Sequence, residues 1–393
     1  MSSDSIVITG ARRTPIGAFQ GVLSGATAPQ LGSAAIAAAV ADTGIDPADV
    51  GEVLMGCVLP AGLGQAPARQ AALGAGIPIG ATCTTINKMC GSGMKSIMMG
   101  HDAIKAGSAA IVVAGGLESM TNAPYLLPKA RGGYRMGHQQ TLDHMFIDGL
   151  QDVYEGHMMG HFAEQTAGKY GFTREQQDAF AVETVSRAQT ALKNGVFADE
   201  VTPVTISTRK GDITIETDET PGTVNVDKIP TLRAAFAKDG TVTAATSSSI
   251  ADGAAATVLM TASDAEKRGI APLARIVGHS SFAHEPAWFT TAPVSAINRL
   301  HEDLGWSVDD VDLYEINEAF AVVTMAAMHD ISIDHKKVNV NGGACALGHP
   351  IGASGARITT TLIYALKTRG LKRGVASLCI GGGEAVAIGI ELE

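Results

Sequence analysis

The chain has few aromatic residues, few charged residues and no long apolar run. Aromatic side chains make up 5% of its 393 residues and charged ones 17%, whereas 46% are hydrophobic. No apolar stretch reaches the roughly 18 residues that a membrane span needs. We therefore expect no membrane partner and a core of Ala, Val, Ile and Leu, which is typical of sheets covered by helices on both faces.

Positive charge is also in short supply. Lys and Arg number 29 against 39 Asp and Glu, which gives a formal net charge of -10. Because nucleic acids and anionic membranes bind mainly to basic surfaces, neither is an expected partner. A local basic pocket for a phosphate group is still compatible with this balance.

Cysteine is scarce, and the number is odd. The chain has 5 Cys, and no apolar secretory segment precedes the first strand-like run, Ile6–Ile8. We expect free thiols in a reduced cytoplasmic compartment. There is no C-x-x-C and no pair of histidines on one predicted helix face, so no metal site is expected.

What the sequence does contain is a repeated pattern. Two Gly-rich turns, CGSG at 90–93 and GASG at 352–355, each open an apolar helix that leads to a buried-looking strand and a glycine run. This internal similarity predicts a duplicated α/β unit. The first repeat supplies one thiol, and the second supplies an imidazole and another thiol. We expect these groups to meet between the two repeats.

Strand and helix signals predict two such units with an insertion between them. Short β-rich runs alternate with Ala-rich helices at both ends of the chain, which predicts parallel sheets. The middle is irregular except for one amphipathic helix over 174–194, and we interpret it as a lid or substrate-binding insertion. We therefore predict an N-terminal half made of 1–118 and 250–270, a loop domain at 119–249 and a C-terminal half at 271–393.

Cys90 is the strongest candidate for a nucleophile. It lies where a predicted helix begins, and the free backbone N–H groups and partial positive charge there favour a thiolate. The neighbouring glycines let the backbone approach a bound group closely. A buried structural cysteine is the alternative. The glycine turn and the internal repeat favour the nucleophile.

Three further side chains are candidates to act with Cys90. His349 lies in a rigid Gly-His-Pro turn that suits general-base work on a thiol, with a hydrogen-bonded loop histidine as the alternative. Cys379 ends an apolar strand, where α/β proteins form ligand sites, with a core cysteine as the alternative. Asn317 precedes a helix predicted over 318–329 and could simply be its N-cap. A short strand is expected at 338–340.

Several long motifs in the same order resemble those of the thiolases. They are ARRTPIGAF, NKMCGSGMKSI, AGGLESMTNAPY, AEQTAGKYGFTREQQDAFA, SSSIADGAAA, EINEAFA, NVNGGACALGHPIGASGAR and LCIGGGEA. The resemblance covers essentially the whole chain. It implies the five-layered α/β/α/β/α thiolase fold, built from two duplicated halves plus an inserted loop domain.

The resemblance also implies a role for each catalytic residue. Cys90 would carry the acyl group as a thioester, His349 would take the proton of the thiol, and Cys379 would move the proton of the α-carbon. Asn317 would hold a water beside His349. The backbone N–H groups of Cys90 and Gly381 would form an oxyanion hole.

The implied substrate-binding residues are Ser248, Met158, Phe289 and Phe320. Ser248 matches the position that contacts the pantetheine arm of coenzyme A. Met158 stands beside the acyl pocket, where several members of the family have a histidine. The bulk of Phe289 and its neighbour Trp288 favours a short acyl group.

Within the family, the resemblance is closest to the acetyl-CoA acetyltransferases. It implies reversible condensation of two acetyl-CoA molecules to acetoacetyl-CoA and coenzyme A, with these thioesters as substrates and no cofactor. It also implies a homo-oligomer, commonly a dimer of dimers. Either Lys228 or Arg233 is a candidate to contact the nucleotide, since the basic residue that some members use is missing.

Three alternatives remain open. One is a degradative thiolase that accepts a broader range of acyl chain lengths. Another is a non-catalytic acyl-CoA-binding protein on the same fold, although Cys90, His349 and Cys379 are all present. The last is a condensing enzyme that uses carrier-protein substrates, whose pattern pairs one Cys with two His, whereas this chain has Cys379.

Overall fold

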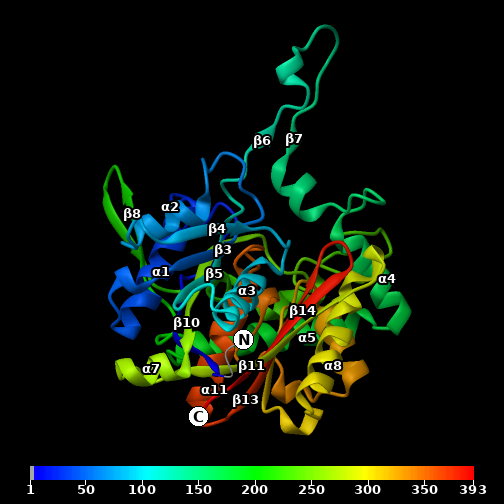
Figure 1. Cartoon of the computed structure of the whole chain (residues 1–393). Coiled ribbons are helices and arrows are strands. Elements are labelled where there is room, and N and C mark those ends of the chain that lie inside the picture. The colour runs from blue at the N-terminus through cyan, green and yellow to red at the C-terminus, as the bar shows by residue number, and fades with distance from the viewer. Residues whose placement is uncertain (1–3) are drawn as a thin grey trace.

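The computed structural model describes residues 4–393 and is built around one mixed sheet (Figure 1). Its strands run in the spatial order β12 (Leu313–Ile316), β13 (Arg373–Ile380), β14 (Glu384–Glu391), β11 (Ala274–Ala283), β1 (Ile6–Arg13), β10 (Ala251–Thr261), β5 (Val112–Ser119), β3 (Glu52–Gly56) and β4 (Thr82–Ile86). The short β2 (Gly17–Ala18) pairs with β10. The two halves join where β1 pairs with β11 over residues 6–8.

The expectation of parallel sheets is only partly correct. The pairs β3 with β4, β3 with β5, and β12 with β13 are parallel, and the other pairs within the large sheet are antiparallel. An antiparallel neighbour can follow through a tight turn, whereas a parallel one needs a long crossover. Gly382 and Gly383 provide such a turn between β13 and β14, with φ of 95° and 90°.

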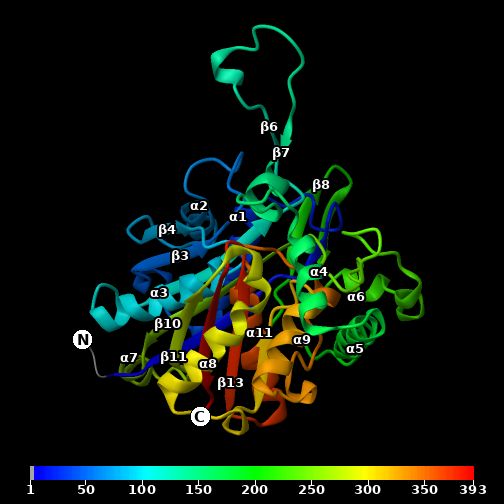
Figure 2. The ribbon, with the colours of Figure 1, turned by 90° about the vertical axis from the view of Figure 1, so that its right-hand side faces the viewer.

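Helices complete the five layers of the predicted fold (Figures 1 and 2). The middle layer consists of α3 (Ser92–Ala106) and α11 (Ser354–Arg369), which pack on each other and against both halves of the sheet. The N-terminal half is covered outside by α1 (Ala28–Thr43) and α2 (Pro67–Gly74). The C-terminal half is covered by α8 (Ala292–Leu304) and α9 (Ala321–Ile331). The α/β/α/β/α prediction is confirmed.

The repeated glycine turns let the two central helices approach each other. A Cβ atom on Gly355 would lie 2.4 Å from the backbone nitrogen of Met94, and one on Gly93 would lie 2.9 Å from that of Ala356. Side chains larger than hydrogen are excluded at both positions unless the backbone moves. The internal repeat seen in the sequence therefore marks the contact between the N-terminal turns of α3 and α11.

The segment between the halves folds onto them and also carries a projection. Its elements are β6 (Tyr125–Leu126), β7 (Leu142–Asp143), α4 (Met159–Tyr170), α5 (Arg174–Lys193), β8 (Val204–Thr208), β9 (Gly211–Ile215) and α6 (Thr220–Thr223). The chain between β6 and β7 extends far from the body (Figures 1 and 2). Buried Arg13 donates to Glu200 at 2.6 Å and Asp218 at 2.7 Å. These charge-assisted bonds attach the segment to β1.

Local signals located several helices well. Thr27 and Thr173 form complete capping boxes at α1 and α5, and Gly195 beyond α5 has φ of 67°. The signals missed α2, α4, β4 and α10 (Ala344–Leu347), whereas the helix that they predict over 263–268 is found as α7 (Ala262–Arg268). Along residues 4–393 no helix is both long and apolar enough to cross a bilayer.

Two predicted elements near the C-terminal half need correction. The helix predicted to begin at Glu318 begins at Ala321, because Phe320 is extended and pairs with Ser247. The strand predicted at 338–340 is reduced to a single bridge between Val338 and Tyr314. Asn339 has φ of 47°, a left-handed conformation outside the extended range of a regular strand.

Candidate active site

A cavity of about 390 Å³ with mainly apolar walls lies where both halves and the inserted segment meet. It holds seven of the nine residues proposed from the sequence for the site: Cys90, Met158, Ser248, Phe289, Phe320, His349 and Gly381. The other two, Asn317 and Cys379, are buried and do not line it. Asn317 approaches His349, and Cys379 lies near enough to Cys90 to interact with its charge.

A tight turn between β4 and α3 presents Cys90. The preceding residue, Met89, has φ of 46°, which is strained for a residue with a side chain. The Ser92 hydroxyl donates to the Met89 carbonyl at 2.6 Å and accepts from the Lys88 N–H at 2.8 Å. These bonds hold the turn that places the thiol at the cavity wall.

The predicted thiolate at Cys90 is wrong for the resting protein. Burial raises the pKa of Cys90 to about 11, although the backbone N–H groups of Gly381 and of Cys90 itself favour the charged form. The helix α3 begins at Ser92 with Gly91 as its N-cap, so Cys90 lies outside the helix, before its N-terminus. Desolvation therefore outweighs the helix terminus, and the thiol is protonated.

Hydrogen bonds to Ser354 determine which nitrogen of His349 is free. The Nδ1 atom lies 2.5 Å from the Ser354 hydroxyl oxygen, and that hydroxyl donates to the Pro350 carbonyl at 2.9 Å. The hydroxyl oxygen therefore accepts from Nδ1–H, and Nε2 keeps its lone pair. Burial, assisted by the positive charge of Arg357, lowers the pKa of His349 to about 3. The imidazole is therefore neutral, and its basic nitrogen is Nε2, the one that is not bonded to Ser354.

Asn317 is not an N-cap, which was the simpler interpretation of its position. Its Nδ2 lies 3.5 Å from Nε2 of His349, and its backbone N–H donates to the Ser377 carbonyl at 3.0 Å. Its Oδ1 is buried and has no hydrogen-bond partner among the residues that the structure describes. An unpaired buried acceptor beside an imidazole indicates a place for a water molecule or a polar ligand atom.

Glu118 and Ser354 are site residues that the sequence reasoning missed. The buried Glu118 carboxylate accepts from the N–H groups of Gly352 at 2.8 Å, Val58 at 2.9 Å and Leu59 at 3.1 Å. Burial raises its pKa to about 7. One side chain from β5 thus holds the turn of the second repeat. A single acid within an apolar strand was the available signal.

Aromatic rings close the apolar end of the cavity. Phe289 packs edge-on against Phe162 with centroids 6.3 Å apart, and Phe320 packs against Phe236 at 5.9 Å. These contacts limit how far the walls can move. Trp288 does not line this cavity. Its ring instead lies 4.4 Å from the Lys169 ammonium.

The structure also has a groove of about 320 Å³. Ser249 lines this groove, and its neighbour in the chain, Ser248, lines the first cavity. Lys228 is part of the lining of the groove, whereas Arg233 is not. Of the two basic candidates for a nucleotide contact, Lys228 is therefore the one that lies at this groove.

Comparisons with known proteins agree with this architecture. The family model described as "Thiolase, N-terminal domain" matches residues 6–263, and "Thiolase, C-terminal domain" matches 270–392. The chain is 49% identical to an acetyl-CoA acetyltransferase of Pseudomonas aeruginosa, covering 98% of both chains. It is 47% identical to one of Rhizobium meliloti, covering 100% of both.

Solved structures give the same result. The acetyl-CoA acetyltransferase of Bacillus anthracis superposes with a TM-score of 0.97 at 42% identity, covering 99% of each chain. A thiolase of Ascaris suum in complex with coenzyme A gives a TM-score of 0.94 at 43% identity, covering 99% of this chain and 100% of that one. With both family models matched end to end and full-length relatives near half identity, the chain belongs to the thiolase family.

Proposed function

We propose that this thiolase is an acetyl-CoA acetyltransferase, which condenses two acetyl-CoA molecules reversibly to acetoacetyl-CoA and free coenzyme A. The observation that carries the proposal is the meeting of Cys90, His349 and Gly381 in one narrow apolar cavity. The names of the full-length relatives support the same activity.

Acylation begins from a neutral pair. The pKa of Cys90 is about 11 and that of His349 about 3, so the resting groups are a thiol and an imidazole. As the Cys90 sulfur attacks the acetyl carbonyl, its proton moves to Nε2 of His349, and the leaving thiolate of coenzyme A takes it from there. The bond from Nδ1 to Ser354 keeps Nε2 available for both transfers.

Two sets of donors stabilise the charge that develops on the two carbonyl oxygens. The N–H groups of Cys90 and Gly381 already point toward the Cys90 sulfur, and they serve the oxygen of the acyl-enzyme. When Nε2 of His349 is protonated, it donates to the thioester oxygen of the second acetyl-CoA together with a water on Asn317, and the unpaired Oδ1 of Asn317 supports the place of that water. Each oxyanion donor contributes about 3 kcal/mol to the transition state.

Cys379 acts at the carbon–carbon step. It is buried, and burial raises its pKa well above the usual value, with the nearby Cys90 adding to the shift. A neutral thiol is the form that reprotonates the α-carbon in the cleavage direction. In the condensation direction, the Cys379 proton passes to Nε2 of His349 after Cys90 has been acylated, and the resulting thiolate removes the α-proton of the second acetyl-CoA. The Cys90 thiolate that is released when the carbon–carbon bond forms takes the proton back from His349.

The walls of the cavity favour a short acyl group. Phe289, Phe320 and Met158 contribute bulk to its lining, and the two rings are held by edge-on neighbours. We assign the pantetheine arm to Ser248 and the phosphate end of coenzyme A to the adjoining groove with Lys228. No metal or redox cofactor takes part in this chemistry.

Residues 119–249 form the loop domain in this proposal, and the halves are 1–118 with 250–270, and 271–393. The projection and the strand β6 at its base expose apolar side chains, since Met136 is 92% and Tyr125, in β6, 68% exposed. Such exposure suits burial against further copies, so we assign a dimer of dimers. The free state of all five cysteines supports a cytoplasmic location.

Cleavage of acetoacetyl-CoA by free coenzyme A tests the proposed function. The rate should be compared with those on six-carbon and ten-carbon 3-oxoacyl-CoA. A strong preference for the four-carbon substrate supports the acetyltransferase, and similar or higher rates on longer chains indicate a degradative thiolase. No activity on any of the three indicates an acyl-CoA-binding protein.

A further inference from the structure

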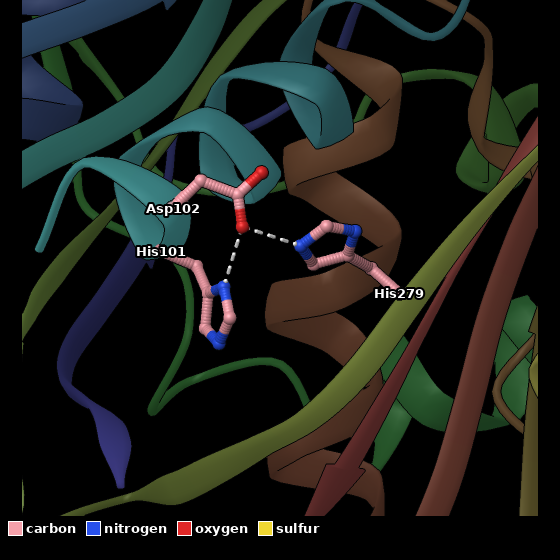
Figure 3. A group of neighbouring side chains, drawn as sticks. All are labelled: His101, Asp102 and His279. Carbon is pink, nitrogen blue, oxygen red and sulfur yellow. Dashed lines mark hydrogen bonds and ion pairs between the residues drawn. The ribbon is translucent and has the colours of Figure 1, made fainter. Parts of the chain in front are cut away.

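Two imidazoles and one carboxylate meet outside the proposed active site (Figure 3). His101 and Asp102 are successive residues in the C-terminal half of α3, and His279 lies on β11. Cys90 precedes the opposite end of α3, and none of the three residues lines the active-site cavity. The cluster therefore needs an explanation separate from the thiolase chemistry.

The donor atoms have the spacing of ligands around a metal ion. The Asp102 Oδ1 lies 2.9 Å from Nδ1 of His101 and 3.0 Å from Nε2 of His279. All three donor atoms lie within 4.8 Å of one another. Two ligands that bind one ion at about 2.1 Å are about 3.0 Å apart at the right angle of an octahedral site and about 3.4 Å apart at a tetrahedral angle, so a shift of a few tenths of an ångström separates the observed spacing from a tetrahedral one. Both imidazole nitrogens face the same carboxylate oxygen (Figure 3).

The packing holds the two rings in place while leaving the carboxylate accessible. The rings are perpendicular with centroids 5.1 Å apart, and the side chains of His101 and His279 are 14% and 19% exposed. Asp102 is 57% exposed, so water can reach the cluster from its side and complete a coordination sphere. The nearby Lys105 ammonium donates to the backbone carbonyl of Asp4, and its positive charge weakens the affinity of the cluster for a cation.

We propose that His101, Asp102 and His279 bind a divalent first-row transition ion of the zinc type. Two imidazoles and a carboxylate suit Zn²⁺, Co²⁺ or Ni²⁺, whereas Mg²⁺ and Ca²⁺ prefer oxygen ligands throughout. The ion takes the place of the hydrogen bonds between Asp102 and the two imidazoles. It links α3, in the first repeat, to β11, in the second, and so stabilises the contact between the halves without entering the reaction.

Sequence spacing does not indicate this site. His279 is 177 residues away from Asp102, and a pair of neighbouring residues on a helix is not a metal motif. Only the packing of α3 against the sheet near β11 and β14 brings the third ligand into place.

Calorimetric titration of the full-length protein with Co²⁺, after treatment with a chelator, tests the proposal. We expect one saturable site per chain and loss of at least tenfold in affinity in His101→Gln and His279→Gln. The midpoint temperature of thermal denaturation should rise by on the order of 3 °C at a Co²⁺ concentration one hundred times Kd. His329→Gln is the matched control, because His329 also bonds the next residue, Asp330, at 2.8 Å.

The remaining outcomes each decide the matter. Absence of saturable binding overturns the proposal, and so does binding that His279→Gln leaves unchanged, since the ion would then occupy the thiols or another surface site. If a histidine variant unfolds in the chelator, the exposed Asp102→Asn replaces it. Binding to that variant at the wild-type affinity also overturns the proposal.

Discussion

The Nδ1 atom of His349 lies 2.5 Å from the hydroxyl oxygen of Ser354, in the glycine turn that opens α11. Because this hydroxyl donates to the Pro350 carbonyl, the imidazole must be the donor in its bond to Ser354. One serine thus keeps the lone pair of the imidazole on Nε2. The turn of the second repeat supplies both the base and the residue that orients it.

Ser354→Ala should lower kcat about tenfold with little change in KM, since it leaves the buried Nδ1–H unpaired and frees the ring to change tautomer. Steady-state kinetics of acetoacetyl-CoA cleavage measure both constants. Ser354→Thr keeps the hydroxyl and should recover most of the rate. Thr359→Val is the control, because the Thr359 hydroxyl lies on the same helix and donates only to the Gly355 carbonyl. An equal loss in the control would contradict a specific role for Ser354.

The low pKa of His349 predicts a pH dependence of stability. Its pKa is about 3 in the folded protein, and an unfolded histidine has a pKa of about 6.5. Between these values the unfolded chain binds more protons, so the free energy of unfolding falls as the pH falls from about 6.5 toward 3. His349 contributes no such loss above that window.

Chemical denaturation of the wild type and His349→Gln between pH 6 and pH 4 measures this effect. The wild type should lose about 1.4 kcal/mol per pH unit more than the variant. His138→Gln, at an exposed histidine of the projection, is the control. Parallel pH profiles for the wild type and His349→Gln would show that His349 is protonated in the folded protein.

Gly355→Ala should destabilise the protein by about 3 kcal/mol, because the added Cβ would lie 2.4 Å from the backbone nitrogen of Met94. Gly168→Ala is the matched control. Gly168 is inside α4 and has no neighbouring atom within 4 Å of the added Cβ, so alanine should stabilise that helix by about 0.5–1 kcal/mol. Equal effects of the two substitutions on the denaturation midpoint would contradict the close packing of α3 and α11.

Phe289→Val should raise the ratio of six-carbon to four-carbon cleavage by about tenfold, since space for added methylenes in an apolar pocket has effects of that size. The ratio is insensitive to any loss of folded enzyme. Trp288→Val is the control, because Trp288 does not line the cavity. A shift of the ratio in the control, or none in Phe289→Val, would show that other residues set the chain length.

The sequence predicted what local rules decide and missed what packing decides. The helix over 174–194 and the paired glycine turns needed only neighbouring residues. The pKa of Cys90 did not follow, because its shift depends on burial by segments far apart in the chain. Glu118 and Ser354 were missed for the same reason, since their partners lie in other elements. Asn339 shows the limit for strands, because its left-handed backbone is set by tertiary contacts.

For the candidate site too, local motifs were predictive and contacts between distant segments were not. The motifs identified seven residues that do line one cavity, and two, Asn317 and Cys379, that lie just behind it. Phe236 gave no signal, because it lies in an irregular stretch without periodicity. Its place against Phe320 appears only when the inserted segment is folded onto the halves.

The central claim is that Cys90 carries the acetyl group and Cys379 acts only at the carbon–carbon step. Intact-mass spectrometry of the wild type, Cys90→Ala and Cys379→Ala after mixing with acetyl-CoA tests it most directly. The account predicts the mass of one added acetyl group in the wild type and in Cys379→Ala, none in Cys90→Ala, and no acetoacetyl-CoA from either variant. An acetyl group on Cys90→Ala, or an unmodified Cys379→Ala that is folded, would contradict it.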